Sequence, residues 1–328
     1  MPSPRLLLCF ALLTAARISP AQTPSRLTPA EIESRAQAAD RLKALIEASP
    51  RLPLTQHDLT VQLPEGKELG KVSWIVRDRK TGVVWLIQRG EKADPVIAVD
   101  PQGRILHSFG KGLYAIPHAI RLDRDGNVWT VDASSSRVLK YTPDGKELLR
   151  IEVGGQLDIP NPFKGTTDIT FAPHNRIFIS DGYGNARVIE YTVAGQRVRE
   201  WGAHGTGPAE FHLPHSIVVD ENNVLYVADR ENGRIEKFDL EGRFLGEIGN
   251  LGRTYSLALG PDGSLWAGTA PLNAPTGAPG WIVKLDRKSG KILGYVPVTE
   301  AGGLHTVEDD GHGHPMTTIN NRIVVFTP

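Results

Sequence analysis

The sequence predicts an all-β protein, a β-propeller of six four-stranded blades preceded by one helix. The first observation is a repeat whose units open at residues 118, 168, 215, 256 and 305, spaced 50, 47, 41 and 49 residues apart. The second is a pattern shared by the units: short runs of Val, Ile, Leu and aromatic residues, separated by turns rich in Asp, Asn and Gly. This period is typical of propeller blades, whereas a β-sandwich has no such period.

The first 21 residues have the features of a secretory signal peptide. Arg5 provides a positive charge, residues 6–16 form a short apolar run, and small residues at 19–21 suit cleavage before Gln22. Because the apolar run is short for a bilayer span, we expect a secreted or periplasmic protein with no membrane span in its mature form. Cys9 is the only cysteine, so the mature chain would have neither a disulfide nor a cysteine-bound metal.

Residues 22–56 are expected to form a helical extension packed on the main domain. Thr28 can cap a helix, with Pro29 in its first turn and Glu31 completing a capping box. One face of this helix collects apolar side chains: Ile32, Ala36, Ala39, Leu42, Leu45 and Ile46. Pro50 ends the helical pattern.

The propeller is predicted over residues 57–328. Its blades are expected to open at Ser73, His118, Asp168, His215, Ser256 and His305. The last unit lacks an outer strand, and the segment 58–63 ahead of the first unit can supply it. Such closure joins the two ends of the propeller and removes free sheet edges.

The charge balance limits the partners of this chain. Lys and Arg together number 37, as do Asp and Glu, so the formal net charge is zero. A neutral chain has no general attraction for nucleic acid or for an anionic membrane. We expect a monomer that binds a small-molecule or peptide substrate and no nucleic acid.

Histidine opens every second blade. The first strand of a blade lines the central channel, and alternate blades of six are a third of a turn apart, so His118, His215 and His305 should converge on the axis. Three imidazoles with an open fourth position are typical of catalytic zinc. A lone histidine at a strand start is more often structural, but three at equivalent positions favour a metal site. His312 and His314 are expected in a solvated turn at the opposite mouth.

The loops after the second strands place further polar groups at the mouth where these histidines lie. Arg89 and Arg230 each follow an aromatic residue by four positions, and Tyr183 lies in the equivalent loop of the third blade. Two guanidiniums and a phenol beside a metal predict a substrate that carries a carboxylate. Cations favour the ionised form of a phenol, so Tyr183 could act as a base. Taken singly, each of these residues could be structural.

The motifs around these residues resemble those of the peptidyl-α-hydroxyglycine α-amidating lyases, or peptidylamidoglycolate lyases. They lie between residues 73 and 305 and are more specific than generic NHL-type propeller repeats. They are Gln88-Arg89-Gly90, Pro117-His118, Asp181-Gly182-Tyr183-Gly184-Asn185-Ala186-Arg187, Trp201-Gly202, Gly207-Pro208-Ala209-Glu210-Phe211, Pro214-His215-Ser216 and Asp229-Arg230-Glu231-Asn232-Gly233-Arg234.

The resemblance implies a six-bladed propeller with a three-histidine zinc site and catalytic roles for Tyr183, Arg89 and Arg230. The implied reaction cleaves a C-terminal α-hydroxyglycine into a peptide amide and glyoxylate. It also implies a structural calcium ion, but the family's Asp after the third histidine is Thr306 here, and its preceding Pro is Leu304. The sequence therefore leaves calcium open.

In the mechanism that we expect, zinc binds the substrate hydroxyl, or the hydroxyl and the carboxylate together, and lowers the pKa of the hydroxyl. Tyr183 then removes the proton. Arg89 and Arg230 hold the carboxylate while the C–N bond breaks. Two other functions remain. A metal-dependent propeller hydrolase, such as a lactonase, would usually hold its metal with carboxylates and Asn. A non-enzymatic extracellular binding propeller of the NHL type would not need histidine in alternate blades.

Overall fold

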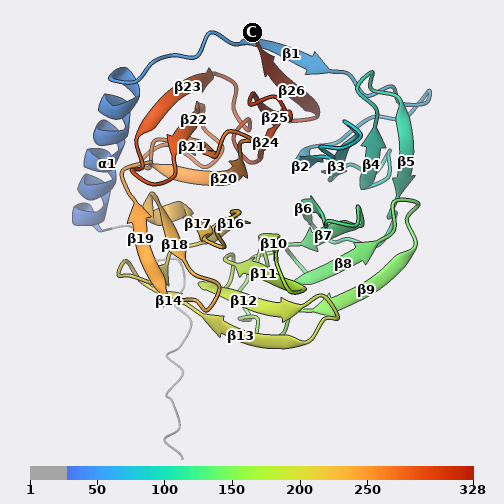
Figure 1. Ribbon diagram of the computed structural model, residues 1–328, viewed down its shortest axis with the longest axis horizontal. Helices are drawn as coiled ribbons and strands as arrows, with labels where there is room; N and C mark the ends of the chain where they lie inside the picture. The colour runs from blue at the N-terminus through green and yellow to red at the C-terminus, as the bar shows by residue number, and fades with distance from the viewer. Residues whose placement is uncertain (1–27) are drawn as a thin grey trace, which may run out of the picture.

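The computed structural model describes residues 28–328, so the expected signal peptide at 1–21 and Cys9 lie outside the described range. Within that range six four-stranded antiparallel sheets surround a central axis, and Figure 1 views this ring along its shortest dimension. Each sheet runs outward from the axis in chain order, except that the last also takes in a strand from the start of the chain. The structure therefore confirms the predicted six-bladed propeller.

The blades follow one another along the chain. Blade one comprises β2 (Val72–Arg77), β3 (Val84–Gln88), β4 (Val96–Val99) and β5 (Ile105–Phe109). Blade two comprises β6 (Pro117–Leu122), β7 (Val128–Asp132), β8 (Arg137–Tyr141) and β9 (Glu147–Glu152). Blade three comprises β10 (Asp168–Ala172), β11 (Arg176–Asp181), β12 (Arg187–Thr192) and β13 (Arg197–Trp201).

The second half of the ring repeats this arrangement. Blade four comprises β16 (Pro214–Val219), β17 (Leu225–Asp229), β18 (Arg234–Phe238) and β19 (Phe244–Ile248). Blade five comprises β20 (Arg253–Leu259), β21 (Ser264–Ala270), β22 (Gly280–Asp286) and β23 (Ile292–Val298). Blade six comprises β24 (Val307–Asp309), β25 (Pro315–Ile319), β26 (Arg322–Thr327) and β1 (Thr55–Leu59). Two short strands, β14 (Ala203–His204) and β15 (Glu210–Phe211), pair between blades three and four.

Strand β1 closes the ring from the N-terminal side. It pairs antiparallel with β26, with Thr55 opposite Thr327 and Leu59 opposite Ile323. The closing strand was expected at 58–63 and begins three residues earlier. The pairing with β26 ends at Leu59, so the second half of the expected segment does not belong to blade six. Val61 and Leu63 instead pack against an apolar cluster that includes residues of blade one.

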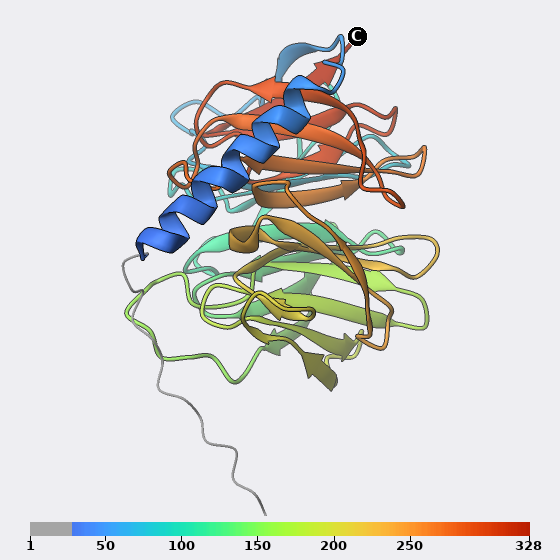
Figure 2. The ribbon, with the colours of Figure 1, turned by 90° about the vertical axis from the view of Figure 1, so that its left-hand side faces the viewer.

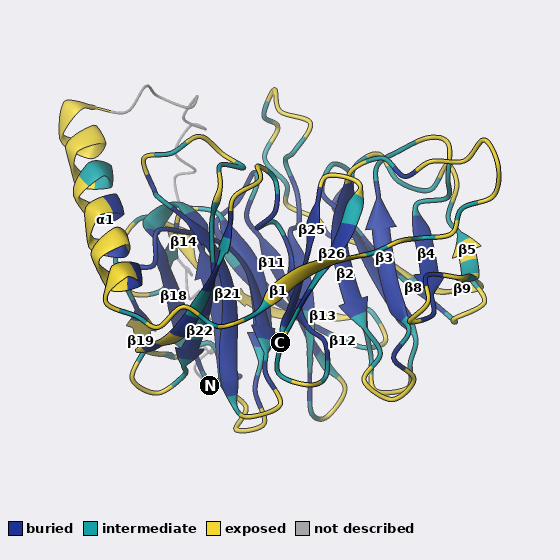
Figure 3. Cartoon of the chain, turned by 90° about the horizontal axis from the view of Figure 1, so that it is seen from above, coloured by how far each residue is buried: buried dark blue, intermediate teal, exposed yellow. Residues whose placement is uncertain are grey.

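Helix α1 (Pro29–Glu47) crosses the outside of the ring, as Figure 2 shows. Thr28 forms the predicted capping box with Glu31. The helix buries Ala39, Leu42 and Ile46, and the last two join the apolar cluster between blades four and five. The rest of its surface is largely exposed (Figure 3). Its buried stripe is narrower than the predicted face, since Ile32 and Leu45 are 56% and 41% exposed.

Apolar side chains fill the spaces between neighbouring blades, and the inner strands are buried (Figure 3). Within residues 28–328, the helices are too short or too polar to span a membrane. The packed sheets fix the directions of the inner strands, which is why the residues that open them can form a site on the axis.

Candidate metal centre and active site

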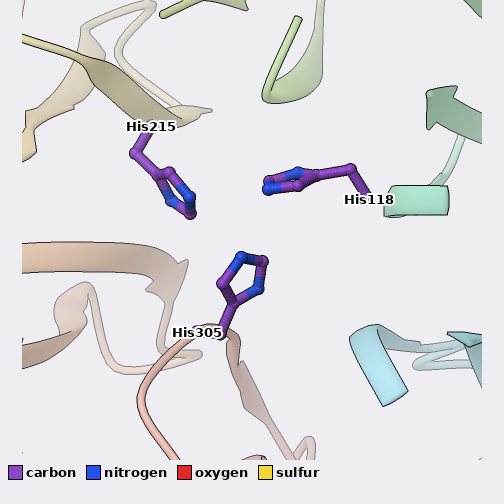
Figure 4. Close-up of side chains that lie close together, drawn as sticks. All are labelled: His118, His215 and His305. Carbon is purple, nitrogen blue, oxygen red and sulfur yellow. The ribbon is translucent and has the colours of Figure 1, made fainter. Parts of the chain in front are cut away.

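The three predicted histidines meet on the propeller axis. Strands β6 and β16 each have a bulge at their start, and the extra residues are His118 and His215. A bulge of this kind re-aims one side chain out of the sheet. His305 lies two residues before β24. One ring nitrogen from each histidine lies within 4.8 Å of the others, and Figure 4 shows the three rings converging from three directions.

Backbone carbonyls fix the orientation of each imidazole. The Nδ1 atoms of His118, His215 and His305 lie 2.6, 2.5 and 2.8 Å from the main-chain oxygens of Thr167, Tyr255 and Ser73 respectively. Because a carbonyl only accepts hydrogen bonds, each Nδ1 carries the proton, and the lone pair is left on Nε2. This is the arrangement in which a protein holds a histidine for metal binding.

The accepting carbonyls belong to the three blades that lack a histidine opener. In blade three the residue next to the axis is Thr167, one position before the expected opener Asp168. In blade five it is Tyr255, one position before the expected opener Ser256. The reason in blade five is a bulge between Thr254 and Ser256. In blade three, both Thr167 and Asp168 face Ser180. Even-numbered blades therefore supply the imidazoles, and odd-numbered blades hold them.

The electrostatic environment keeps the three imidazoles neutral. Burial lowers the pKa of each, and neighbouring imidazoles or guanidiniums lower it further. For His215 the pKa falls to about 3. At neutral pH the Nε2 atoms are thus free of protons that a metal ion would have to displace.

The hydroxyl of Tyr183 lies beside the imidazole cluster, 2.9 Å from Nε2 of His118 and 3.1 Å from Nε2 of His215. The phenol has one proton and can satisfy only one of these two acceptors. The cluster therefore has more lone pairs than protons. This donor set suits a divalent metal that prefers imidazole, such as zinc.

The turn that carries Tyr183 is fixed from both sides. Asp181 ends β11 and accepts hydrogen bonds from Asn185 and Arg187. A side chain at Gly182 would approach the main-chain oxygen of Pro214 to 2.1 Å, so only glycine fits this approach. Burial raises the pKa of Tyr183, although Arg230 and Arg89 act to lower it. In the absence of a metal ion, burial thus outweighs the two cations that were expected to favour the ionised phenol.

Arg89 follows β3 and has an unused hydrogen-bond donor. Its Nε donates to the main-chain oxygen of Pro117 at 2.9 Å, and its guanidinium lies 5.2 Å from the ring centre of Phe163. Its Nη2 is buried and has no hydrogen-bond partner among residues 28–328. Burial lowers the pKa of Arg89. An unpaired buried guanidinium nitrogen favours an anionic ligand.

Arg230 lies across the mouth from Arg89, in the 3-10 turn η1 (Arg230–Asn232). Its Nε donates to Glu231 at 3.0 Å, and its guanidinium lies over the ring of Tyr255 at 5.5 Å. Arg89, Arg230, Tyr183 and His305 line one pocket of about 330 Å³. A second hollow, of about 380 Å³ at the rim of blade one, includes none of the predicted site residues.

Several lining residues were missed in the sequence. Phe163 contacts Tyr183, with 5.1 Å between the ring centres. It lies in the long connection between β9 of blade two and β10 of blade three. Tyr255 was assigned to the position before a blade opener and so was not considered. Charge and aromatic character alone do not distinguish these residues from ordinary loop residues.

The axis below the imidazoles is closed by Trp74, whose ring centre lies 5.7–6.4 Å from those of the three histidines. Arg121 stacks on Trp74 at 5.0 Å and donates to Asp168 from Nε at 3.0 Å and from Nη2 at 2.7 Å. The carboxylate of Glu308 lies 3.7 Å from the same guanidinium. A buried cation held between two carboxylates therefore fills this part of the channel.

His312 and His314 lie in the turn between β24 and β25, where Nδ1 of His314 contacts Asp310 at 3.1 Å. Among residues 28–328, the only group of three His, Asp or Glu side chains arranged to hold a metal is the set on the axis. That the turn with His312 and His314 is a solvated turn without metal stays a prediction.

Comparison with known proteins adds an independent line of evidence. A family model described as a 6-bladed beta-propeller matches residues 160–306. Peptidyl-glycine alpha-amidating monooxygenase of Mus musculus is 36% identical over 166 residues, covering 47% of this chain and 17% of the mouse protein. Peptidyl-alpha-hydroxyglycine alpha-amidating lyase 1 of Drosophila melanogaster is 31% identical over 183 residues, covering 51% of this chain and 34% of the fly protein.

The chain is a relative of the amidating lyases. The matches span 17% and 34% of the length of these two relatives, so the relationship concerns only that part of each protein. Among solved structures, a streptogramin B lyase superposes with a TM-score of 0.59 at 16% identity, covering 84% of this chain and 97% of that one. At this low identity, the similarity to the streptogramin B lyase shows only that the two proteins share a fold.

Proposed function

We propose that the protein is a zinc-dependent lyase that cleaves the N–C bond of an α-hydroxyglycine-type carbinolamide and releases an amide and glyoxylate. The observation that carries the proposal is that three neutral imidazoles converge on the axis beside a pocket lined by His305, Tyr183 and Arg89, and that Nη2 of Arg89 has no hydrogen-bond partner among the described residues. The relationship to amidating lyases agrees with it. His118, His215 and His305 would hold the zinc ion, which when bound supplies Lewis-acid polarisation of the substrate oxygen.

Arg89 and Arg230 would bind the carboxylate of the substrate. Arg89 and Arg230 both line the pocket, and the buried Nη2 of Arg89 has no hydrogen-bond partner among the described residues. Guanidiniums that are partly removed from water bind a carboxylate more strongly than exposed ones. Their fixed positions would place the α-carbon next to the imidazole cluster and Tyr183.

Tyr183 would move the proton. When the substrate hydroxyl loses its proton, its oxygen forms a carbonyl with the α-carbon, the C–N bond breaks, and the electron pair goes to nitrogen. The amide nitrogen then needs one proton. The phenol oxygen lies at the imidazole cluster, and Arg230 and Arg89 act to lower its pKa. Tyr183 would accept the first proton as the phenolate, a form that a bound metal ion would favour further, and would then return that proton to nitrogen.

The proposal includes an exported protein, on the basis of residues 1–21, that acts as a monomer on a carboxylate-bearing small molecule or peptide. A propeller hydrolase is a weaker alternative, because the lining of the described pocket includes no carboxylate to activate water. A binding propeller would have no use for three imidazoles with their lone pairs aimed at one point.

The proposal is tested with purified mature protein. We expect one zinc ion per chain by elemental analysis, and release of glyoxylate from N-benzoyl-α-hydroxyglycine followed by proton NMR. Metal removal should stop the release, and added zinc should restore it. A simple lactone should remain intact. Stoichiometric zinc without glyoxylate release would contradict the lyase, and hydrolysis of the lactone would favour the hydrolase.

We further propose that the chain needs no structural calcium. The family's Asp is Thr306 here, and its buried Oγ1 has no hydrogen-bond partner among the described residues. Arg121 already provides a buried positive charge below the imidazoles, paired with Asp168 and close to Glu308. Burial raises the pKa of Glu308, and Arg121 opposes that rise. This internal guanidinium would offset the negative charge of the buried carboxylates without a bound cation.

Replacing Arg121 by Met should lower the free energy of unfolding by about 3–5 kcal/mol, because Asp168 and Glu308 would be left buried without their cation. Urea unfolding measures this loss. Millimolar calcium should leave the wild-type midpoint unchanged. The exposed Arg124→Met, in the next turn, is the control and should cost less than about 0.5 kcal/mol. A calcium-dependent midpoint in the wild type would show that a calcium site exists after all.

A further inference from the structure

Helix α1 reaches the mouth of the candidate site through one side chain. Arg35 extends the buried stripe of Ala39, Leu42 and Ile46 by one turn toward the N-terminus. Its Nη1 donates to Oε2 of Glu231 at 3.1 Å and lies 3.5 Å from the main-chain oxygen of Leu272. The side chains of Arg35 and Glu231 are 16% and 10% exposed, so the link between helix and propeller is largely shielded from water.

Glu231 joins three guanidiniums. Its Oε1 accepts from Nε of Arg230 at 3.0 Å and from Nε of Arg253 at 2.9 Å. Its Oε2 accepts from Arg35 at 3.1 Å and from Nη2 of Arg253 at 3.2 Å. A carboxylate has about four lone-pair positions, and all of them are used here. Burial raises the pKa of Glu231, but the guanidiniums outweigh this effect and lower it to about 2, so the group stays charged.

This network fixes the direction of Arg230. Arg35 and Arg253 hold the carboxylate of Glu231 from behind, so that Oε1 faces Nε of Arg230. The other nitrogens of Arg230 remain available at the pocket, beside Tyr183 and Tyr255. Arg253 also donates to the main-chain oxygens of Leu272 and Ala274, which fixes the loop that lines the far side of the pocket.

We propose that Arg35 and Glu231 are positioning residues, through which helix α1 holds Arg230 in the orientation that binds the substrate carboxylate. The inference deepens the proposed function, on which the role of Arg230 rests. In this proposal helix α1 helps to orient a substrate-binding residue, in addition to covering an apolar surface of the propeller. Arg41 offers the contrast. It lies on the same helix, and within residues 28–328 the one hydrogen bond of its side chain runs from Nε to Oδ1 of the exposed Asn250, at 3.0 Å.

The kinetic test compares Arg35→Met, Arg41→Met and Glu231→Gln. Since a misplaced binding group costs up to about a hundredfold, we expect Glu231→Gln to lower kcat/KM about 10- to 100-fold, mainly through KM. Arg35→Met should cost about three- to tenfold, since Arg253 still holds Glu231, and Arg35→Lys should recover part of this loss. Arg41→Met should leave both constants unchanged.

A double variant separates positioning from simple destabilisation. If Arg35 acts through Glu231, adding Arg35→Met to Glu231→Gln should cause no further loss of kcat/KM. Thermal midpoints of all variants check that they are folded. Additive losses in the double variant, or equal effects of Arg35→Met and Arg41→Met, would overturn the inference.

A second readout does not depend on turnover. Phenylglyoxal modifies accessible guanidiniums, and peptide mass spectrometry reports its rate at Arg230 in protein without substrate. We expect modification to be fastest in Glu231→Gln, intermediate in Arg35→Met, and as slow in Arg41→Met as in the wild type. If the wild type releases no glyoxylate but this order holds, only the proposed function fails. If it releases glyoxylate and all rates are equal, only the positioning fails.

Discussion

Replacing His215 by Ala should abolish zinc binding at neutral pH and bring glyoxylate release below detection. Nε2 of His215 is one of the three imidazole acceptors that meet on the axis. In the variant, the backbone oxygen of Tyr255 would also lose its hydrogen bond from Nδ1 of His215. Loss of a group that merely orients a metal ligand costs about 10- to 100-fold in affinity, so loss of a ligand itself should cost more than about 100-fold. Competition with a chelator of known affinity measures the change.

His312→Ala is the matched control for this experiment. His312 lies in the β24–β25 turn, outside the three-histidine group, so zinc affinity and turnover should stay within twofold of the wild type. Full lyase activity in His215→Ala would show that the axis is not the site of reaction. Zinc lost from His312→Ala but kept by His215→Ala would place the metal in the turn and return the protein to the group of binding propellers.

The axial position of the histidines was predictable because a propeller repeats the same geometry at every blade. His118 and His215 each follow a proline at the start of an apolar run, and each run was predicted to be an inner strand. His305 was placed by the spacing of the repeat. The one-residue error at Asp168 and Ser256 has a physical cause: a bulge places two residues opposite one partner, and sequence patterns do not reveal which of the two faces the axis.

Contacts between segments distant in sequence were not predictable. Arg35 and Glu231 are 196 residues apart, and neither the helical pattern nor the blade repeat relates them. Trp74 belongs to β2 of blade one, yet it closes the channel beneath three histidines from other blades. Such contacts depend on how the blades close into a ring, and in particular on strand β1, whose start was itself misplaced by three residues.

The effect of burial on Tyr183 was also beyond the sequence. The neighbouring guanidiniums were foreseeable, and they do act to lower the pKa of the phenol. How much water the surrounding loops exclude depends on Phe163 and the long connection that carries it. Burial turns out to be the larger influence, so without a metal ion the phenol keeps its proton. The positive charge of a bound metal ion would favour loss of that proton, which Tyr183 needs in order to act as a base.

Tyr183→Phe should therefore separate binding from chemistry. Only the phenolic oxygen is lost, while the aromatic contact with Phe163 and the three imidazoles remain. Loss of a positioned proton-transfer group costs about 10²- to 10⁴-fold in rate, so kcat should fall by that factor. Zinc content should be unchanged. KM should change little, because Arg89 and Arg230 still hold the carboxylate.

A matched control is Tyr114→Phe, which removes a similarly buried phenolic oxygen from the connection between β5 and β6. That hydroxyl contacts Thr130 at 2.9 Å and lies outside the candidate pocket, so the change should cost about 1 kcal/mol of stability and no turnover. Steady-state kinetics and urea unfolding of both variants test the pair. If Tyr183→Phe kept its kcat, the proton would have to leave by another route, and Tyr183 would only bind substrate. If it lost zinc as well, the phenol would belong to the metal site, and the division of roles between imidazoles and phenol would be wrong.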